Sequence, residues 1–232
     1  QMQRGQTWYQ GTADAIYQNL NLIENYRPDI VAVFGADHIY RMDLGLMIDQ
    51  HLEREAEVSI ASIRVPRAEA AGLGIVEVGQ QGRVTRFLEK PAEPPEIPDM
   101  PGYCLASMGI YLFNRQVLAE ALDNGMTDFG KEVIPSLLGK KRLFASIFEG
   151  YWEDIGTVRA FFEANLALAQ ANPPFDFYDA TSPIYSEEQH LPAAKVDRCA
   201  VECAVIADGC MLAAASLKHS VLGVRSRVGE GT

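Results

Sequence analysis

The chain has 232 residues, of which 48% are hydrophobic, and a formal net charge of −11 from 31 acidic side chains against 20 Lys and Arg. This acidic balance argues against nucleic-acid or anionic-membrane partners, because both favour basic patches. No apolar run reaches the ~20 residues of a membrane span, and no secretory signal pattern opens the chain. The four cysteines form no CxxC pair, so we expect free thiols in a reducing cytoplasm rather than zinc or disulfides.

The first three quarters of the chain alternate between helical and strand-like patterns. After Thr12, which suits an N-cap, apolar residues recur at helical spacing from Ala13 to Ile23, and Pro28 ends that helix. The apolar run 30–34 then predicts a strand that is covered on both faces, as in a parallel sheet. Further helices are expected at 43–55, 117–122, 130–138 and 157–170, and further strands at 58–64, 74–78, 84–88, 105–113 and 143–148. This alternation predicts an α/β domain with a mostly parallel, Rossmann-like sheet.

Residues 91–101 interrupt the alternation with five prolines and two glutamates. Such a segment cannot form a central strand or a helix. We interpret it as a surface loop, with a flap beside Lys90 as the alternative.

The character of the sequence changes near residue 172. Residues 173–195 lack periodicity and indicate a linker that wraps the surface. An apolar residue then recurs about every six positions, with one slip of a single residue, at Val205, Met211, Leu217, Leu222 and Val228. A hexapeptide period is typical of a parallel β-helix, of which about two coils would fit here, and a strand pair with Ala-rich turns is the alternative. We therefore predict a catalytic-type domain over 1–172, a linker over 173–195 and the start of a β-helix over 196–232.

Two carboxylates stand where the pattern places strand ends. Asp37 follows the strand 30–34 after two small residues, and Asp154 lies just before the turn into the helix 157–170. Open α/β sheets bind ligands at the carboxyl ends of their strands. Mg²⁺ usually takes one or two protein carboxylates together with substrate phosphates. The pair therefore predicts a Mg²⁺ site, although each aspartate alone could instead cap the helix that follows it.

Three further segments carry candidate binding residues. At the end of the strand 84–88, Lys90 can place a point charge on a phosphate and Glu89 can accept hydrogen bonds from a sugar; the alternative is a solvated surface pair. Glycine inside the strand at Ser107-Met108-Gly109 is typical of a close approach by a ligand or another backbone. Asp128 is interpreted as a helix cap that, with Phe129, can also face a sugar. Together with the two aspartates, these residues predict phosphoryl or nucleotidyl transfer.

Six strings, in this order and at this spacing, resemble the glucose-1-phosphate adenylyltransferase family of sugar-nucleotide pyrophosphorylases. They are WYQGTADA (8–15), GADHIYRMD (35–43), FLEKP (87–91), SMGIY (107–111), DFGK (128–131) and YWEDIGT (151–157). The resemblance implies a Mg²⁺-dependent reaction of ATP with α-D-glucose 1-phosphate that gives ADP-glucose and pyrophosphate in glycogen or starch biosynthesis.

The resemblance also implies a role for each matching residue. Asp37 and Asp154 hold the metal, and Lys90 binds the phosphate of glucose 1-phosphate. Tyr9 and Gly11 lie beside the nucleotide. The glucose pocket is lined by Glu89, Ser107, Asp128, Phe129 and Trp152.

Other expectations follow from the family. Its members are homo- or hetero-tetramers under allosteric control, with a C-terminal left-handed β-helix, in the cytoplasm or the plastid stroma. Its Gly-rich ATP loop and most of its β-helix have no counterpart here, so we expect a fragment that is inactive by itself. The alternatives are a catalytically weak regulatory subunit, a pyrophosphorylase for another sugar nucleotide, and a hexapeptide-repeat acyltransferase, for which His219 is weak support.

Overall fold

The structure is a computed structural model that describes residues 8–232. The chain divides into two compact units. The first extends to Ala36 and resumes over Met42–Gly150, and the second combines Asp37–Arg41 with Tyr151–Thr232. No helix in the described part of the chain is both long and apolar enough to span a membrane.

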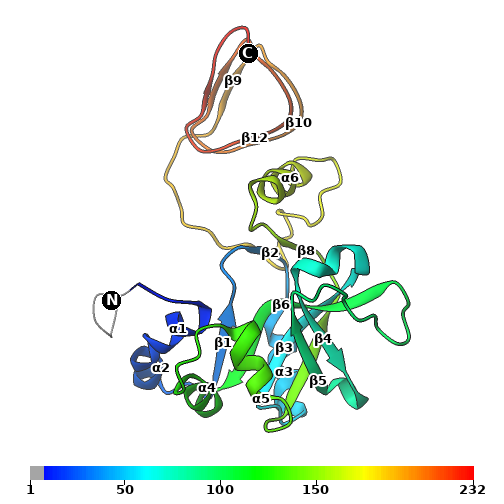
Figure 1. Ribbon diagram of the computed structural model, residues 1–232. Coiled ribbons are helices and arrows are strands. Elements are labelled where there is room, and N and C mark those ends of the chain that lie inside the picture. The colour runs from blue at the N-terminus through cyan, green and yellow to red at the C-terminus, as the bar shows by residue number, and fades with distance from the viewer. Residues whose placement is uncertain (1–7) are drawn as a thin grey trace. The chain divides into compact units, whose positions relative to one another are not determined.

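A six-stranded sheet forms the centre of the first unit (Figure 1). Its strands are β1 (Ile30–Phe34), β3 (Val58–Pro66), β4 (Gly74–Val78), β5 (Val84–Glu89), β6 (Tyr103–Asn114) and β7 (Leu143–Phe148). The order is β5-β4-β6-β3-β7, with β1 also paired to β6. Since β6 is antiparallel to β1, β3 and β4, and β7 is parallel to β3, most strands run in one direction and β5 and β6 run in the other. The α/β class is confirmed, and the long antiparallel β6 makes the sheet a mixed one.

Strand β6 changes partner halfway along one edge. Its C-terminal half pairs with β1, down to Phe34 opposite Ile110, and its N-terminal half meets β4 where Ile75 lies opposite Ala106. Between these partners Gly109 adopts a φ of 68° and its carbonyl accepts a hydrogen bond from Gly35 N at 3.1 Å. The register with β3 shifts at the same level. The glycine predicted to mark a close approach therefore lies at a β-bulge.

Helices and short turns pack on this sheet. They are α1 (Thr12–Tyr17), α2 (Leu20–Tyr26), α3 (Leu44–Glu53), α4 (Arg115–Leu122), a π-helical turn (Phe129–Val133), α5 (Ile134–Leu137) and the 3-10 turns Arg67–Gly72 and Gln80–Gly82. The core joins both layers, with Phe113 and Leu143 from the sheet and Leu118 and Ile134 from the helices among its buried members.

Two helices predicted as continuous are interrupted in the structure. Helix 12–23 is divided between α1 and α2 at Asn19, whose side chain donates to the carbonyl of Ala15 at 2.8 Å. An asparagine that bonds the backbone in this way competes with the helix. The expected helix 130–138 is a π-helical turn followed by the short α5, in which Pro135 removes a helical N–H donor.

The second unit contains a two-stranded ribbon, one longer helix and a solenoid. In the ribbon, β2 (His38–Tyr40) pairs antiparallel with β8 (Trp152–Asp154). Helix α6 (Val158–Leu168) begins as predicted at Thr157, whose hydroxyl accepts a hydrogen bond from Ala160 N. No helix or strand lies between α6 and residue 195 in this described segment. The guanidinium of Arg41 holds that segment through the carboxylate of Asp179 at 2.9 Å and the carbonyls of Asp176 and Ser182.

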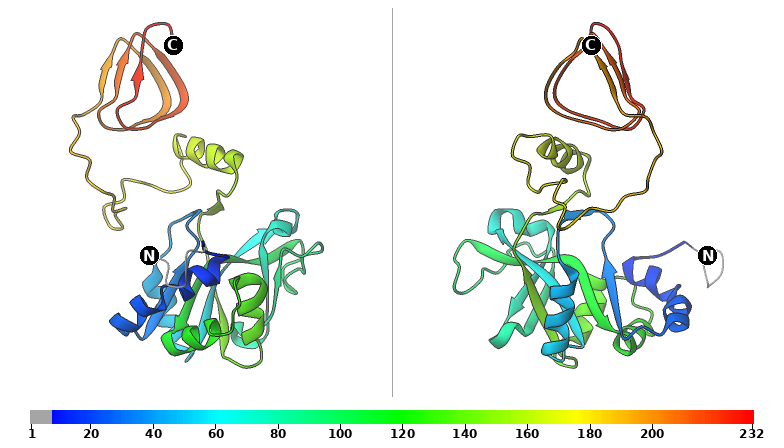
Figure 2. Two further views of the ribbon diagram at one scale, coloured as in Figure 1. Left: turned by 60° about the vertical axis from the view of Figure 1, so that its left-hand side comes forward. Right: turned by 180° about the vertical axis from the view of Figure 1, so that it is seen from behind.

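The C-terminal segment coils as a parallel β-helix, seen end-on as a triangle in Figure 1 and with its coils stacked in Figure 2. Its strands are β9 (Lys195–Asp197), β10 (Ala200–Ile206), β11 (Met211–Ala213), β12 (Ser216–Leu222) and β13 (Arg227–Val228). Lys195 pairs with Met211 and Met211 with Arg227, which is a repeat of 16 residues.

The repeat is therefore shorter than the hexapeptide cadence predicts. Residues with positive φ lie at the corners, every five or six positions, at Arg198, Cys203, Gly209, Ala214, His219 and Arg225. Left-handed backbone turns the chain sharply, which shortens some sides of the triangle to five residues. The inward positions are those of Leu212 and Leu217, whereas Met211, expected on the cadence, is 49% exposed.

Candidate active site

The two predicted metal ligands lie together on the ribbon of the second unit. Asp37 immediately precedes β2, and Asp154 ends β8 opposite His38. The Oδ1 atom of Asp154 accepts a hydrogen bond from Gly156 N at 2.8 Å. A β-carbon at Gly156 would lie 3.0 Å from that atom and 3.6 Å from Asp37 Oδ2. Both carboxylates therefore face the space above Gly156, on a separate ribbon rather than on the edge of the main sheet.

The donor set suits a hard cation that shares its coordination with a substrate. Asp37 is 63% exposed at its side chain. No group of three or more His, Cys, Asp and Glu within residues 8–232 could enclose a metal. A structural zinc site needs four protein ligands, whereas Mg²⁺ is commonly held by one or two carboxylates and by phosphate oxygens. Asp37 and Asp154 fit the second arrangement.

Trp152 and His38 pack against each other beside these carboxylates. Their ring centroids are 5.2 Å apart and the rings are inclined by 63°. His38 Nε2 lies 3.6 Å from Asp37 Oδ1. Among residues 8–232, Trp152 Nε1 and His38 Nδ1 are buried and have no protein hydrogen-bond partner. A buried donor of this kind is suited to meet a polar atom of a ligand or water.

In the first unit, Glu89 and Lys90 lie where β5 ends. The Oε2 atom of Glu89 is 2.5 Å from the position that a β-carbon would take at Gly130. Burial raises the pKa of the Glu89 carboxyl, and the charge of Asp128 raises it further, while Lys90 and Lys131 lower it. The backbone of Lys90 has a φ of 48°, and its side chain is exposed. Such a backbone costs about 1–3 kcal/mol in a non-glycine residue and is common at functional sites.

Ser107 belongs to a cluster of buried side chains in the first unit, together with Tyr111 and Phe129. Its hydroxyl contacts the hydroxyl of Tyr111 at 3.5 Å, at the limit of a hydrogen bond. Burial raises the pKa of Tyr111 to about 12. The Tyr111 ring stacks on Phe129 with centroids 5.7 Å apart. Phe129 is 3% exposed and belongs to the core, so its ring supports Tyr111.

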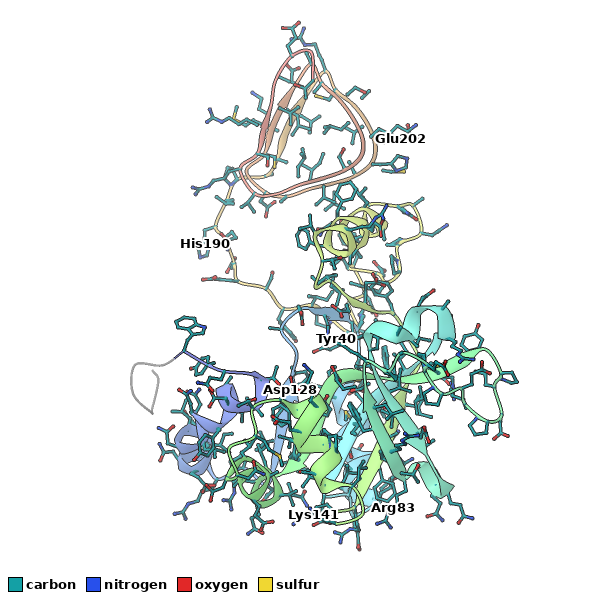
Figure 3. The ribbon with its side chains drawn as sticks, viewed as in Figure 1. Tyr40, Arg83, Asp128, Lys141, His190 and Glu202 are labelled. Atoms are coloured by element: carbon teal, nitrogen blue, oxygen red, sulfur yellow. The ribbon has the colours of Figure 1, made fainter. Side chains whose placement is uncertain are left out.

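Asp128, labelled in Figure 3, lies on the loop that leads into the π-helical turn. Its Oδ1 atom accepts a hydrogen bond from Lys131 N at 2.8 Å, which confirms the predicted cap. The preceding carbonyl, of Thr127, accepts from Ala13 N at 2.8 Å. A β-carbon at Gly11 would lie 2.2 Å from that carbonyl oxygen. The small residues at the start of α1 therefore allow close packing against this loop.

The structure thus places the predicted residues in two groups, one in each unit. The first unit holds Tyr9, Gly11, Glu89, Lys90, Ser107, Asp128 and Phe129, and the second holds Asp37, Trp152 and Asp154. Tyr9 is 37% exposed, and its hydroxyl accepts a hydrogen bond from Asn19. Sequence reasoning missed Tyr111, Gly130 and Glu132, which contact or support the first group. Glu132 lies four positions after the cap Asp128, one more than the capping-box spacing, so that pattern gave no signal for it.

Comparisons with known proteins agree with the two structural parts. Residues 1–171 match the nucleotidyl transferase family, and residues 189–232 match the GLGC left-handed parallel beta-helix domain. These matches confirm the fold class, whereas the exact domain limits stay predictions.

Similar curated proteins carry the name glucose-1-phosphate adenylyltransferase. The one from Nitrosospira multiformis is 39% identical over 96% of this chain and 57% of its own length. That from Dechloromonas aromatica is 42% identical over 93% of this chain and 54% of its own length. That from Corynebacterium jeikeium is 38% identical over 100% of this chain and 62% of its own length. The chain therefore spans between about half and three fifths of these relatives.

Proposed function

The chain belongs to the nucleotidyl transferase family, and we propose that the whole protein transfers an adenylyl group from ATP to α-D-glucose 1-phosphate. The products are ADP-glucose and pyrophosphate. The proposal rests on the similarity to glucose-1-phosphate adenylyltransferases along nearly the whole chain. Within the second unit, the proximity of the carboxylates of Asp37 and Asp154 around Gly156 also supports it.

In this reaction a phosphate oxygen of glucose 1-phosphate attacks the α-phosphorus of ATP. The bond between the α-phosphorus and its bridging oxygen to the β-phosphorus breaks, and pyrophosphate leaves with that oxygen. Such transfers depend mainly on positioning and on the neutralisation of charge. A candidate site for them therefore needs cations and rigid donors more than a nucleophilic side chain.

Each group of residues has a proposed part in that positioning. Asp37 and Asp154 would hold Mg²⁺, which supplies charge neutralisation at the phosphates when it is bound. The exposed ammonium of Lys90 would bind the phosphate of the sugar as a point charge. Glu89 would accept hydrogen bonds from sugar hydroxyls while its carboxylate is ionised. Trp152, with its unpartnered indole N–H, is a further candidate for a sugar hydroxyl.

A substrate panel tests the proposal. Pyrophosphate release by the whole protein would be measured with ATP, GTP, CTP, UTP or dTTP, each with glucose 1-phosphate or mannose 1-phosphate. We expect kcat/KM to be highest for ATP with glucose 1-phosphate. A preference for another pair would indicate a pyrophosphorylase for another sugar nucleotide. Folded protein that is inactive with every pair would favour the regulatory subunit. The tetramer, the allosteric control and the cytoplasmic location stay predictions.

A further inference from the structure

One carboxylate oxygen in the first unit accepts three hydrogen bonds from two consecutive residues. The Oε2 atom of Glu132 lies 2.8 Å from Thr127 N, 3.2 Å from Thr127 Oγ1 and 3.1 Å from Asp128 N. Hydrogen bonds from these backbone N–H groups lower the pKa of Glu132, so the side chain stays ionised at neutral pH. Hydrogen bonds to an ionised acceptor are roughly twice as strong as neutral ones.

A second contact returns from the loop to the turn that carries Glu132. Asp128 Oδ1 accepts from Lys131 N at 2.8 Å, while Glu132 accepts from the backbone N–H of Asp128. The pattern resembles a capping box, except that Asp128 accepts from the backbone of Lys131 rather than from that of Glu132. It fixes both the backbone and the side chain of Asp128.

The same peptide group is held from its other side. The carbonyl of Thr127 accepts from Ala13 N at 2.8 Å, and Gly11 packs against it. Phe129 N donates to the hydroxyl of Thr12 at 3.2 Å. The peptide between Thr127 and Asp128 therefore joins the Gly11–Ala13 segment on its carbonyl side to Glu132 on its N–H side.

We propose that Glu132 is a positioning residue for both substrates of the adenylyl transfer. By fixing the peptide between Thr127 and Asp128, it orients Asp128 toward the sugar and holds Gly11 in place beside the nucleotide. The inference rests on the proposed function, because these two residues are substrate contacts only in that reaction. A carboxylate that merely capped a turn would instead change stability without changing the kinetics of the folded enzyme.

Three substitutions in the whole protein separate these roles. Glu132→Ala removes the acceptor, Glu132→Gln keeps an acceptor oxygen of the same reach, and Glu132→Asp keeps the charge but shortens the reach. The matched control is Glu120→Ala, which removes an exposed glutamate on α4 whose partner is Lys141. For each variant, kcat and KM for both substrates are measured per mole of folded protein.

We expect Glu132→Ala and Glu132→Asp to lose roughly 10- to 100-fold in kcat/KM, the cost of displacing a positioned group by about 1 Å. The loss should appear for glucose 1-phosphate and for ATP, Glu132→Gln should recover part of it, and Glu120→Ala should resemble the wild type. If Glu132→Ala does not fold, the kcat/KM values of Glu132→Gln and Glu132→Asp test the proposal instead. Kinetics of folded Glu132 variants that equal those of Glu120→Ala would overturn the proposal.

Amide hydrogen exchange tests the contact without any substrate. We expect the N–H groups of Thr127 and Asp128 to exchange at least about tenfold faster in Glu132→Ala than in Glu120→Ala. Unchanged protection would contradict the positioning role even if activity fell. If the wild type forms no ADP-glucose, the proposed function fails, and the exchange rates still decide whether Glu132 holds the peptide.

Discussion

The carboxylate of Glu89 occupies the space that a side chain at Gly130 would need. A β-carbon there would lie 2.5 Å from Glu89 Oε2 and 3.0 Å from its Cδ atom. These two residues come from strand β5 and from the π-helical turn, which are far apart in the sequence. Glycine at position 130 therefore determines where the candidate sugar-binding carboxylate can lie.

Gly130→Ala should reduce activity more than stability. The atom that the methyl group meets is the end of a flexible side chain, so Glu89 can move at low cost and the free energy of unfolding should change by about 1 kcal/mol or less. The displaced carboxylate should lower kcat/KM for glucose 1-phosphate by roughly 10-fold or more. The measurements are kcat/KM for glucose 1-phosphate and the free energy of unfolding from chemical denaturation. Gly72→Ala is the control, because nothing lies within 4 Å of its β-carbon position.

Gly11→Ala, by contrast, should reduce the stability of the protein more than its activity. Its methyl group would lie 2.2 Å from the carbonyl oxygen of Thr127, a backbone atom that cannot rotate away. Overpacking of this kind typically costs about 1–3 kcal/mol. Denaturant unfolding should show a lower midpoint than for Gly72→Ala. Equal midpoints for the two variants would mean that the loop moves freely away from α1.

Lys90→Ala should chiefly raise the KM for glucose 1-phosphate. The exposed ammonium is proposed to bind the phosphate of this substrate, so its loss should affect ATP much less. A charge-assisted hydrogen bond of about 1.5–3 kcal/mol corresponds to a change of roughly 10- to 100-fold. Lys140→Ala, which also removes an exposed lysine, is the matched control. An unchanged KM for glucose 1-phosphate would refute the phosphate role.

Tyr111→Phe should make the protein less sensitive to alkali. The pKa of Tyr111 is raised from 10.0 to about 12 in the folded state, chiefly by burial. Its contribution to stability is therefore complete below pH 10 and is lost as the pH rises through about 12. The difference corresponds to roughly 3 kcal/mol. Unfolding curves between about pH 9 and 12 should separate the two proteins only at the alkaline end.

Long periodic elements could be predicted from the sequence, and short ones could not. Runs of apolar residues indicate strands such as β3 and β6, and Thr157 is a residue type typical of a helix cap. By contrast, β2 and β8 have three residues each, too few for any period to show. Their pairing brings Asp37 and Asp154 together. The sequence pattern correctly placed both residues at strand ends, but it assigned them to the main sheet instead of a separate two-stranded ribbon.

The candidate site residues could be identified from the sequence because their motifs lie at turns. The residues that support them by packing could not. Gly130 and Tyr111 act through contacts between distant segments, and no local pattern in the sequence indicates such contacts. The solenoid repeat illustrates the same limit. The apolar cadence indicated a β-helix, but the left-handed backbone at Cys203 and Ala214, which shortens the coil, is a conformation that these residue types do not favour.

The most direct test of the account is the rate of ADP-glucose formation by the whole protein carrying Asp37→Asn. The substitution removes one charge from the pair proposed to hold Mg²⁺ and leaves the size of the side chain unchanged. Asp49→Asn, at an exposed position on α3, is the matched control. We predict that Asp37→Asn lowers kcat by orders of magnitude at unchanged stability, while Asp49→Asn is as active as the wild type. Near-normal turnover in Asp37→Asn would contradict the proposed metal site and the reaction built on it.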